Sequence, residues 1–250
     1  MLRINQLNPY GTSKVNEVPS PNNAPRFRTH MFSFQKGELA PHRNIMPCVL
    51  FGQGAPITVS SQSRELKAEI VCIMPGVLHS VSIGSGGAEI VYLDGLQLST
   101  DRGELSIVTA EFANVPVAIK NTDAGVVEDF RFALSRPLLE PDFEVLKIVL
   151  QLYAAPMERM SQEQLASQLG LERTLALRHF KANTGQTFRK FKIWCASVAT
   201  VHRVLSGQNI GAAGIDSGFS DAAHVARTAR DLFGITPTMG IGALREFKSM

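Results

Sequence analysis

Cysteine is scarce in this 250-residue sequence, and long apolar runs are missing. The three cysteines, Cys48, Cys72 and Cys195, are scattered and odd in number. They argue against a disulfide framework and favour a reducing compartment. No apolar run approaches the roughly 20 residues that cross a bilayer, and residues 1–25 lack the apolar segment of a signal peptide. We therefore expect a cytoplasmic protein without a membrane span.

Motifs of common enzyme chemistry are also missing. The sequence has no glycine-rich phosphate loop, no serine nucleophile elbow and no Cys-x-x-Cys pair. The residue two places after His42 is Asn44, so no His-x-His metal pair forms, and His79 stands alone. Other possible ligands have no supporting spacing: His30, Glu38 and Cys48. We expect no enzymatic activity, no cofactor and no metal, with His42 and His79 either structural or lining a cavity.

Residues 1–25 are rich in Pro, Asn and Ser, which predicts a flexible N-terminal arm. From Arg26 the chain changes to short alternating or β-branched stretches separated by Gly and Pro. The stretches expected to be strands are FRTHMFSF, IMPCVLF, ITVSS, AEIVCIM, HSVSI, AEIVYLDG and EDFRFAL, while RGELSIVTAEF fits a strand or a short helix. Residues 26–135 therefore predict an all-β barrel or sandwich, an architecture that often encloses a ligand cavity.

The pattern changes to that of helices beyond residues 136–141, where two prolines predict a linker. Asp142 is a suitable N-cap, and DFEVLKIVLQLYAA then places apolar residues at spacings of three and four. Residues 142–250 thus predict a second, all-α domain.

Two helix-turn-helix units are expected in this second domain, in SQEQLASQLGLERTLALRHF and in NIGAAGIDSGFSDAAHVARTARDLFGITP. The first opens with a capping box, S-Q-E-Q. Such a unit needs a small residue, a turn glycine and apolar residues that lock its two helices. The residues that fit are Ala166, Gly170, Leu171 and Leu175 in the first unit, and Gly214, Gly218, Phe219 and Val225 in the second. A long helix over Phe188–Leu205, about 27 Å at 1.5 Å per residue, joins the units.

Positive charge gathers over both units. Residues 172–250 hold 11 Lys and Arg against 5 Asp and Glu, whereas residues 1–138 hold 12 of each. A basic surface of this kind suits contact with nucleic-acid phosphates.

Residues 142–247 resemble the DNA-binding domain of the AraC/XylS family of bacterial transcription regulators, through LASQLGLERTLALRHFKANTGQTFRKF and GIDSGFSDAAHVARTARDLFGITP. The resemblance implies a seven-helix, two-lobed domain whose two recognition helices enter the major groove about one DNA turn apart. Residues 26–132 are similar to the cupin-like N-terminal domains of that family, notably at IMPGVLHSV.

The resemblance also implies base-reading positions. These are Thr174, Leu177 and Arg178 in the first recognition helix, and Ala223, His224 and Arg227 in the second. The two arginines can offer a bidentate donor fork to guanine or clamp a phosphate. The implied partners are double-stranded promoter DNA, a small-molecule effector, a second protomer, and RNA polymerase for an activator.

The second unit departs from the family pattern. Val225 and Ala229 stand where the family usually has bulky aromatic residues, so we expect a smaller or repacked core there. Gly211 and Gly214 lie inside its first helix, where each costs roughly 1 kcal/mol relative to Ala. We infer that the first unit carries most of the sequence specificity.

The N-terminal domain is expected to sense an effector, with a cavity lined by Phe34, His42, Leu50, His79 and Tyr92. Four alternatives remain open at this point: a filled β-core that only dimerises, oxidant sensing by Cys48 and Cys72, a metal-dependent cupin enzyme fused to a helical domain, and a regulator held by a protein antagonist.

Overall fold

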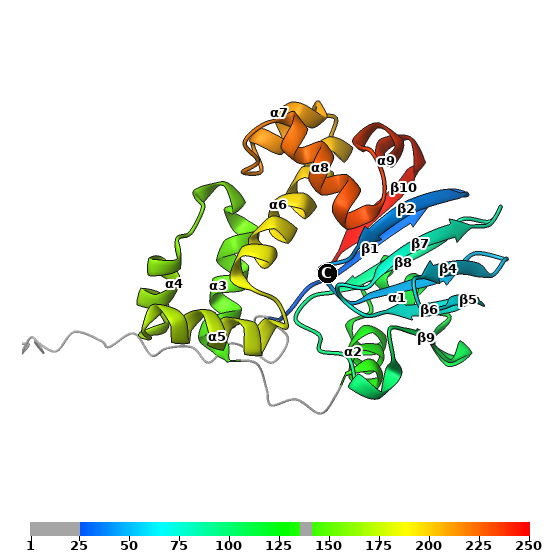
Figure 1. Ribbon diagram of the computed structural model, residues 1–250, viewed down its shortest axis with the longest axis horizontal. Coiled ribbons are helices and arrows are strands. Elements are labelled where there is room, and N and C mark those ends of the chain that lie inside the picture. The colour runs from blue at the N-terminus through cyan, green and yellow to red at the C-terminus, as the bar shows by residue number, and fades with distance from the viewer. Residues whose placement is uncertain (1–25, 136–141) are drawn as a thin grey trace, which may run out of the picture.

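A computed structural model describes residues 26–135 and 142–250, so the predicted arm and linker lie outside the described residues. Two antiparallel sheets form the N-terminal region, as predicted (Figure 1). The strands of the larger sheet, in spatial order, are β10 Leu244–Ser249, β1 Thr29–Phe34, β8 Ala88–Leu93, β3 Cys48–Gly52, β6 Ile70–Ile73 and β9 Leu105–Ile107. Those of the smaller sheet are β2 Gly37–Arg43, β7 Leu78–Ile83, β4 Ile57–Ser61 and β5 Glu65–Ala68.

One predicted strand is a helix. The segment EDFRFAL forms the second half of α2, Ala124–Leu134, whose N-cap Asp123 accepts a hydrogen bond from the amide of Val126. Its alternating phenylalanines suggested a strand, but Phe130 is fully buried and Phe132 is 82% exposed. Helical spacing explains this difference, because residues two apart lie on nearly opposite sides of a helix.

Helices α1, Val115–Lys120, and α2 cover the outer face of the larger sheet. Their buried residues pack against Met31, Val49 and Leu93 of the strands. Strands β1 and β8 are therefore buried on both faces. By contrast, only two of the seven residues of β2 are buried, and β7 alternates between buried and partly buried residues, as expected for a sheet with one face nearer to solvent.

The C-terminal region is helical, as predicted. Its helices are α3 Phe143–Ala154, α4 Gln162–Leu169, α5 Arg173–Thr184, α6 Phe188–Leu205, α7 Ile210–Ile215, α8 Ala222–Phe233 and α9 Pro237–Ala243. Short 3-10 turns occupy Thr100–Arg102, Ala110–Phe112 and Pro156–Glu158. Helix α6 spans the range predicted for it, and Gly207 follows with a φ of 94°, the left-handed conformation that favours glycine after a helix.

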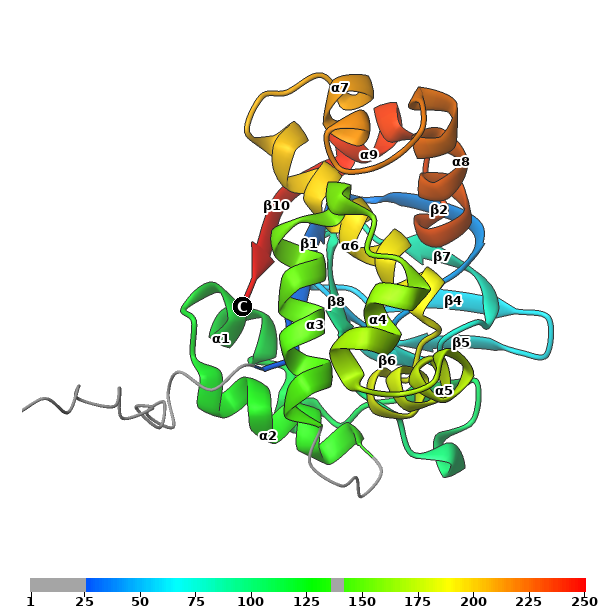
Figure 2. The ribbon, with the colours of Figure 1, turned by 90° about the vertical axis from the view of Figure 1, so that its left-hand side faces the viewer.

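Strand β10 returns from the helical region to the N-terminal sheet, which was not predicted (Figures 1 and 2). It pairs antiparallel with β1, and Thr29 and Met250 exchange backbone hydrogen bonds of 2.8 and 3.0 Å at its end. The ring of Phe247 lies 4.9 Å from that of Phe32. The two regions therefore share a sheet as well as a continuous apolar core, which runs from the strands into α3, α5 and α6.

Candidate nucleic-acid interface

Local sequence signals shape the first helix-turn-helix unit, α4 and α5. The hydroxyl of Ser161 accepts a hydrogen bond from the Gln164 amide at 3.1 Å, and the Gln164 side chain accepts one from the Ser161 amide at 2.6 Å. This capping box satisfies two amides at the start of α4. Gly170 ends α4 with a φ of 62°, and Glu172 caps α5 by accepting from the Thr174 amide at 2.8 Å. A glycine in the left-handed conformation thus ends α4, and an acidic side chain caps the start of α5.

Helix α5 presents the predicted base-reading residues on its outer side. Thr174 and Arg178 are exposed and Leu177 is partly buried, while Ala176 and Phe180 are fully buried against the core. The prediction that Leu175 locks the two helices together is wrong, because Leu175 is 50% exposed. The buried stripe runs through positions 176 and 180, one helical turn apart, and position 175 lies about 100° away from it.

The second unit, α7 and α8, depends on close helix packing. Asp221 caps α8 by accepting a hydrogen bond from the His224 amide at 2.7 Å. A Cβ atom added at Gly214 would overlap the side chain of Val225. The glycine that lowers helix propensity in α7 is therefore required by the approach of α8. The second unit is intact in the structure despite this composition.

The three predicted base-reading residues of α8 differ in their exposure and in their contacts. Ala223 and Arg227 are exposed, whereas His224 is partly buried. The His224 ring stands edge-on to Phe219 with centroids 5.1 Å apart, and its Nδ1 lies 3.2 Å from the Ser220 hydroxyl. The unit itself therefore orients His224, and Arg227 supplies the exposed cation among these three positions.

Helix α6 holds the two units at its opposite ends (Figures 1 and 2). Its Phe188, Phe191 and Trp194 are buried in the core that the strands and helices share. Eighteen residues give it a length of about 27 Å, compared with the ~34 Å of one DNA turn. The helix is thus a packed spacer between the two units, somewhat shorter than one DNA turn.

Exposed cations surround both recognition helices. They are Arg173, Arg178, Lys181, Arg189, Lys190, Arg227 and Arg230. Arg173 lies 3.7 Å from Glu163 in an ion pair that is exposed on both sides and therefore weak. Such a surface can neutralise phosphates, and each neutralised phosphate makes binding more sensitive to salt.

The five predicted effector-binding residues lie in three places. Phe34 of β1 lines an apolar cavity between the larger sheet and the second unit. Leu50 and Tyr92 belong to the shared core, where the Tyr92 ring lies 5.0 Å from Trp194. The remaining two, His42 and His79, face each other on β2 and β7. The structure therefore does not bring the five residues together into one pocket.

The two histidines form a buried neutral pair. Their ring centroids are 4.2 Å apart, and each Nδ1 donates to a backbone carbonyl, of Ala40 at 2.8 Å and of Val77 at 2.9 Å. Burial, with a smaller contribution from His79, lowers the pKa of His42 to about 4. Burial also lowers the pKa of His79. In residues 26–135 and 142–250, no group of three His, Cys, Asp or Glu side chains is placed to hold a metal.

All three cysteines are buried as thiols. Burial raises the pKa of Cys72 to about 12 and raises the pKa values of Cys48 and Cys195 well above their usual range. Oxidants and electrophiles react with the thiolate. This environment therefore argues against oxidant sensing by Cys48 and Cys72.

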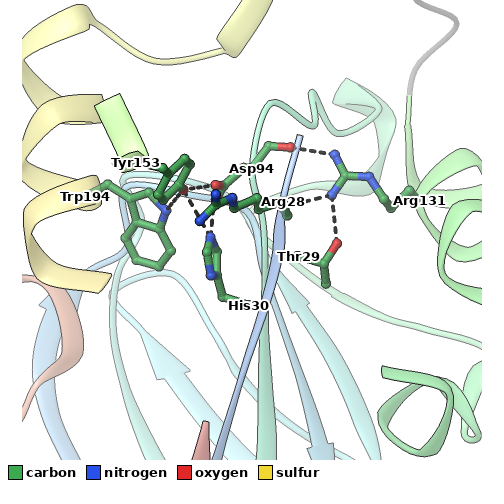
Figure 3. A network of polar contacts seen from close by, with 7 residues as sticks. All are labelled: Arg28, Thr29, His30, Asp94, Arg131, Tyr153 and Trp194. Carbon is green, nitrogen blue, oxygen red and sulfur yellow. Dashed lines mark hydrogen bonds and ion pairs between the residues drawn. The ribbon is translucent and has the colours of Figure 1, made fainter. Parts of the chain in front are cut away.

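A buried polar network joins the two regions, and Figure 3 shows it. The Tyr153 hydroxyl of α3 donates to Asp94, just beyond β8, and accepts from the Trp194 indole of α6 at 2.9 Å. His30 of β1 lies 3.1 Å from the same Asp94 carboxylate oxygen. The Arg28 guanidinium sits 4.3 Å over the Tyr153 ring. Buried polar side chains from the two regions thus form hydrogen bonds with one another.

Arg131 of α2 extends this network on the N-terminal side. It donates to the Asp94 carbonyl at 2.5 Å and to the Thr29 hydroxyl at 3.1 Å, although burial lowers its pKa. Sequence reasoning missed this cluster, since its members are far apart in the chain. The one available signal was polar residues inside apolar strand stretches, such as His30 in FRTHMFSF.

The second recognition helix also docks on the smaller sheet. The Ala40 amide of β2 donates to the Gly234 carbonyl, at the end of α8, at 2.8 Å. Gly234 has a φ of 66°, and a Cβ there would overlap the Ala40 carbonyl and the His42 ring. The position of α8 is therefore tied to the N-terminal region through backbone contact.

Comparison with known proteins supports this architecture. The family described as Helix-turn-helix domain matches residues 165–239. No curated protein sequence matches the chain. No helix of the described residues is long and apolar enough to cross a membrane.

Solved structures of ToxT from Vibrio cholerae share the fold over most of the chain. An apo form of a single-residue variant is 11% identical with a TM-score of 0.58, over 87% of this chain and 97% of that one. A form bound to an unsaturated fatty acid is 10% identical with a TM-score of 0.58, over 87% and 96%. A form bound to (E)-4-(8-methylnaphthalen-1-yl)but-3-enoic acid is 9% identical with a TM-score of 0.54, over 85% and 97%. Residues 165–239 thus form a DNA-binding helix-turn-helix domain of the AraC type, on a chain with the two-domain fold of ToxT.

Proposed function

We propose that the chain is a transcription regulator that binds promoter DNA through α5 and α8, and that its N-terminal region controls this binding in response to a small effector. The observation that carries the proposal is the placement of two capped recognition helices at the ends of one packed spacer. Their exposed arginines, Arg178 and Arg227, provide the donor forks that base edges and phosphates accept.

The mechanism of control follows from the contacts between regions. The Tyr153–Asp94 network, strand β10 and the Ala40–Gly234 hydrogen bond all fix the helical region against the sheets. An effector switches such a protein when it binds one arrangement of the regions better than another. The comparison supports a small effector, because two of the similar ToxT structures hold a bound organic acid.

Two rival functions have less support. A metal-dependent enzyme would need further ligands beside His42 and His79, and residues 26–135 and 142–250 place no group of three His, Cys, Asp or Glu side chains to hold a metal. Control by a protein antagonist or by dimerisation alone would need an exposed binding surface. Phe132, 82% exposed on α2, is a candidate for such a surface, but we favour the effector because a cavity lies between the two regions.

The test is a titration of purified protein with DNA fragments enriched by in vitro selection, at several salt concentrations. We expect a preferred sequence and a steep loss of affinity with salt. The double variant Arg178→Ala/Arg227→Ala should lose that preference, whereas Lys67→Ala, an exposed charge on β5, should retain it. The absence of any salt-sensitive sequence preference would refute the function.

A further inference from the structure

The cavity between the second helix-turn-helix unit and the larger sheet has a volume of about 90 Å³. Its walls come from both regions: Phe32 and Phe34 of β1 on one side, and residues of α6 to α9 on the other. Leu205, 46% exposed, is also part of the wall. The cavity is partly open to solvent, but its apolar walls do not close on one another as they usually do in a folded protein.

Two small residues of α8 account for it. Val225 and Ala229 are one helical turn apart, and both line the cavity. The resemblance to the AraC/XylS family implies bulky aromatic residues at these two positions. A larger side chain cannot enter at position 225, because Val225 already touches Gly214. Position 229 is therefore where an aromatic ring is missing from the core.

The lining is uncharged. It includes no Lys, Arg, His, Asp or Glu, and its polar side chains are the hydroxyls of Ser197, Thr200 and Thr228. Ser197 donates to the Ile193 carbonyl and Thr200 to the Ala196 carbonyl, each at 2.8 Å, so both are used within α6. A carboxylate placed here would lose its hydration without gaining a cationic partner, which costs several kcal/mol.

We propose that this cavity binds a small uncharged apolar molecule about the size of a single ring, which fills the place of the missing aromatic side chain. A dry cavity of roughly 150 Å³ lined by apolar side chains admits benzene, so a ring requires a modest outward movement of the wall at Leu205. The ligand class differs from the organic acids named for ToxT. This inference rests on the proposed function for its regulatory consequence, but not for binding itself.

The regulatory consequence follows from the position of the walls. A molecule in the cavity touches β1 and α8 at the same time, so it stabilises the arrangement in which α8 is docked on the sheets. The Gly234 carbonyl and the Ala40 amide, 2.8 Å apart, mark that arrangement. Binding therefore changes DNA affinity only through the placement of the second recognition helix.

The test compares two probes of matched shape, ethylbenzene and phenylacetate, by calorimetry and by thermal unfolding of the full chain. We expect ethylbenzene to bind at least tenfold more tightly than phenylacetate and to raise Tm. The variant Ala229→Phe should abolish ethylbenzene binding and raise Tm without ligand. Ala229→Leu serves the same purpose if the phenylalanine does not fold, and Ala154→Phe, on the exposed side of α3, should bind like wild type.

Three results would overturn the inference: no binding of ethylbenzene to the wild-type chain, equal binding of the two probes, or unchanged binding in the Ala229 variants. DNA binding by the unliganded chain is measured in parallel. A chain that binds ethylbenzene but no DNA refutes the proposed function and keeps the ligand site. A chain that binds DNA but neither probe refutes the ligand site alone.

Discussion

The hydroxyl of Tyr153 donates a hydrogen bond to the carboxylate of Asp94, and this contact joins the first helix of the C-terminal helical region to the end of strand β8 (Figure 3). Both side chains are buried, and the Asp94 side chain has no exposed surface. The described residues offer no hydrogen-bond partner to the second carboxylate oxygen of Asp94 or to Nδ1 of His30. The Asp94 carboxylate is therefore stabilised only through its other oxygen, which the Tyr153 hydroxyl and the His30 ring contact.

Replacing Tyr153 with Phe removes one donor to a buried carboxylate. We expect Tyr153→Phe to lower the free energy of unfolding by about 1–3 kcal/mol, the cost of leaving a buried polar group with fewer partners. Urea denaturation measures this value. Tyr92→Phe is the matched control, because the Tyr92 hydroxyl faces the Cys48 thiol, a weak partner. Equal losses in the two variants would show that the Asp94 contact adds no stability.

The buried histidines make stability depend on pH. The pKa of His42 is about 4 in the folded chain and 6.5 in the unfolded chain. As pH falls below 6.5, the unfolded state therefore takes up a proton that the folded state excludes, and stability is lost until about pH 4. Between pH 7 and pH 5 we expect a loss of about 2 kcal/mol from His42, with a further loss from His79 in the same direction.

Chemical denaturation at pH 7 and pH 5 tests this dependence. The variant His42→Gln should show a smaller difference between the two pH values than the wild-type chain. His202→Gln removes an exposed histidine of α6 and should leave the difference unchanged. A wild-type chain that is equally stable at both pH values would contradict the expectation.

Gly234 controls how α8 docks on β2. Gly234→Ala introduces a Cβ that overlaps the Ala40 carbonyl, besides the strain of a φ of 66°. Gly170→Ala is the matched control, since Gly170 also ends a helix, with a φ of 62°, but has open space around it. We expect the control to cost about 1 kcal/mol and Gly234→Ala to cost clearly more, with faster hydrogen exchange at the Ala40 amide. Equal effects of both substitutions would show that the docking contact is dispensable.

The two recognition helices are expected to differ in specificity. The first presents Thr174, Leu177 and Arg178, whereas the second begins with two alanines and a histidine that packs on its own unit. On selected DNA, Arg178→Ala should reduce discrimination against mismatched sequences by roughly 1–3 kcal/mol. Arg227→Ala should weaken binding to all sequences more evenly. A greater loss of discrimination from Arg227→Ala would reverse this assignment.

The sequence predicted the helices well because their signals are local. The caps at Asp142 and Ser161 and the C-terminal glycine Gly170 lie directly beside the helix boundaries that they fix. Strand β2 was missed because GELAPHR carries charges and a proline, and only two of its seven residues are buried. The segment EDFRFAL was assigned to the wrong class because a short run with phenylalanines two apart fits a strand as well as a helix.

In the candidate site, too, the features with local sequence signals were predicted and those without were not. The recognition helices were found because a helix-turn-helix unit is contiguous in sequence. The Tyr153–Asp94 network and the cavity were not, since each combines residues from distant elements. The small residues at 225 and 229 predicted only a smaller or repacked core, and not a cavity.

The pairing of β10 with β1 bears on the order in which the chain folds. Phe32 pairs with Phe247, so the edge of the larger sheet closes only after more than two hundred residues have been added. Contacts of such long sequence separation form slowly, because the loop between them must first be ordered. Until then, the backbone groups along the outer edge of β1 are open to pairing with another chain, a recognised route to aggregation. Newly made chains should therefore depend on chaperones, or on low concentration, for longer than either region would alone.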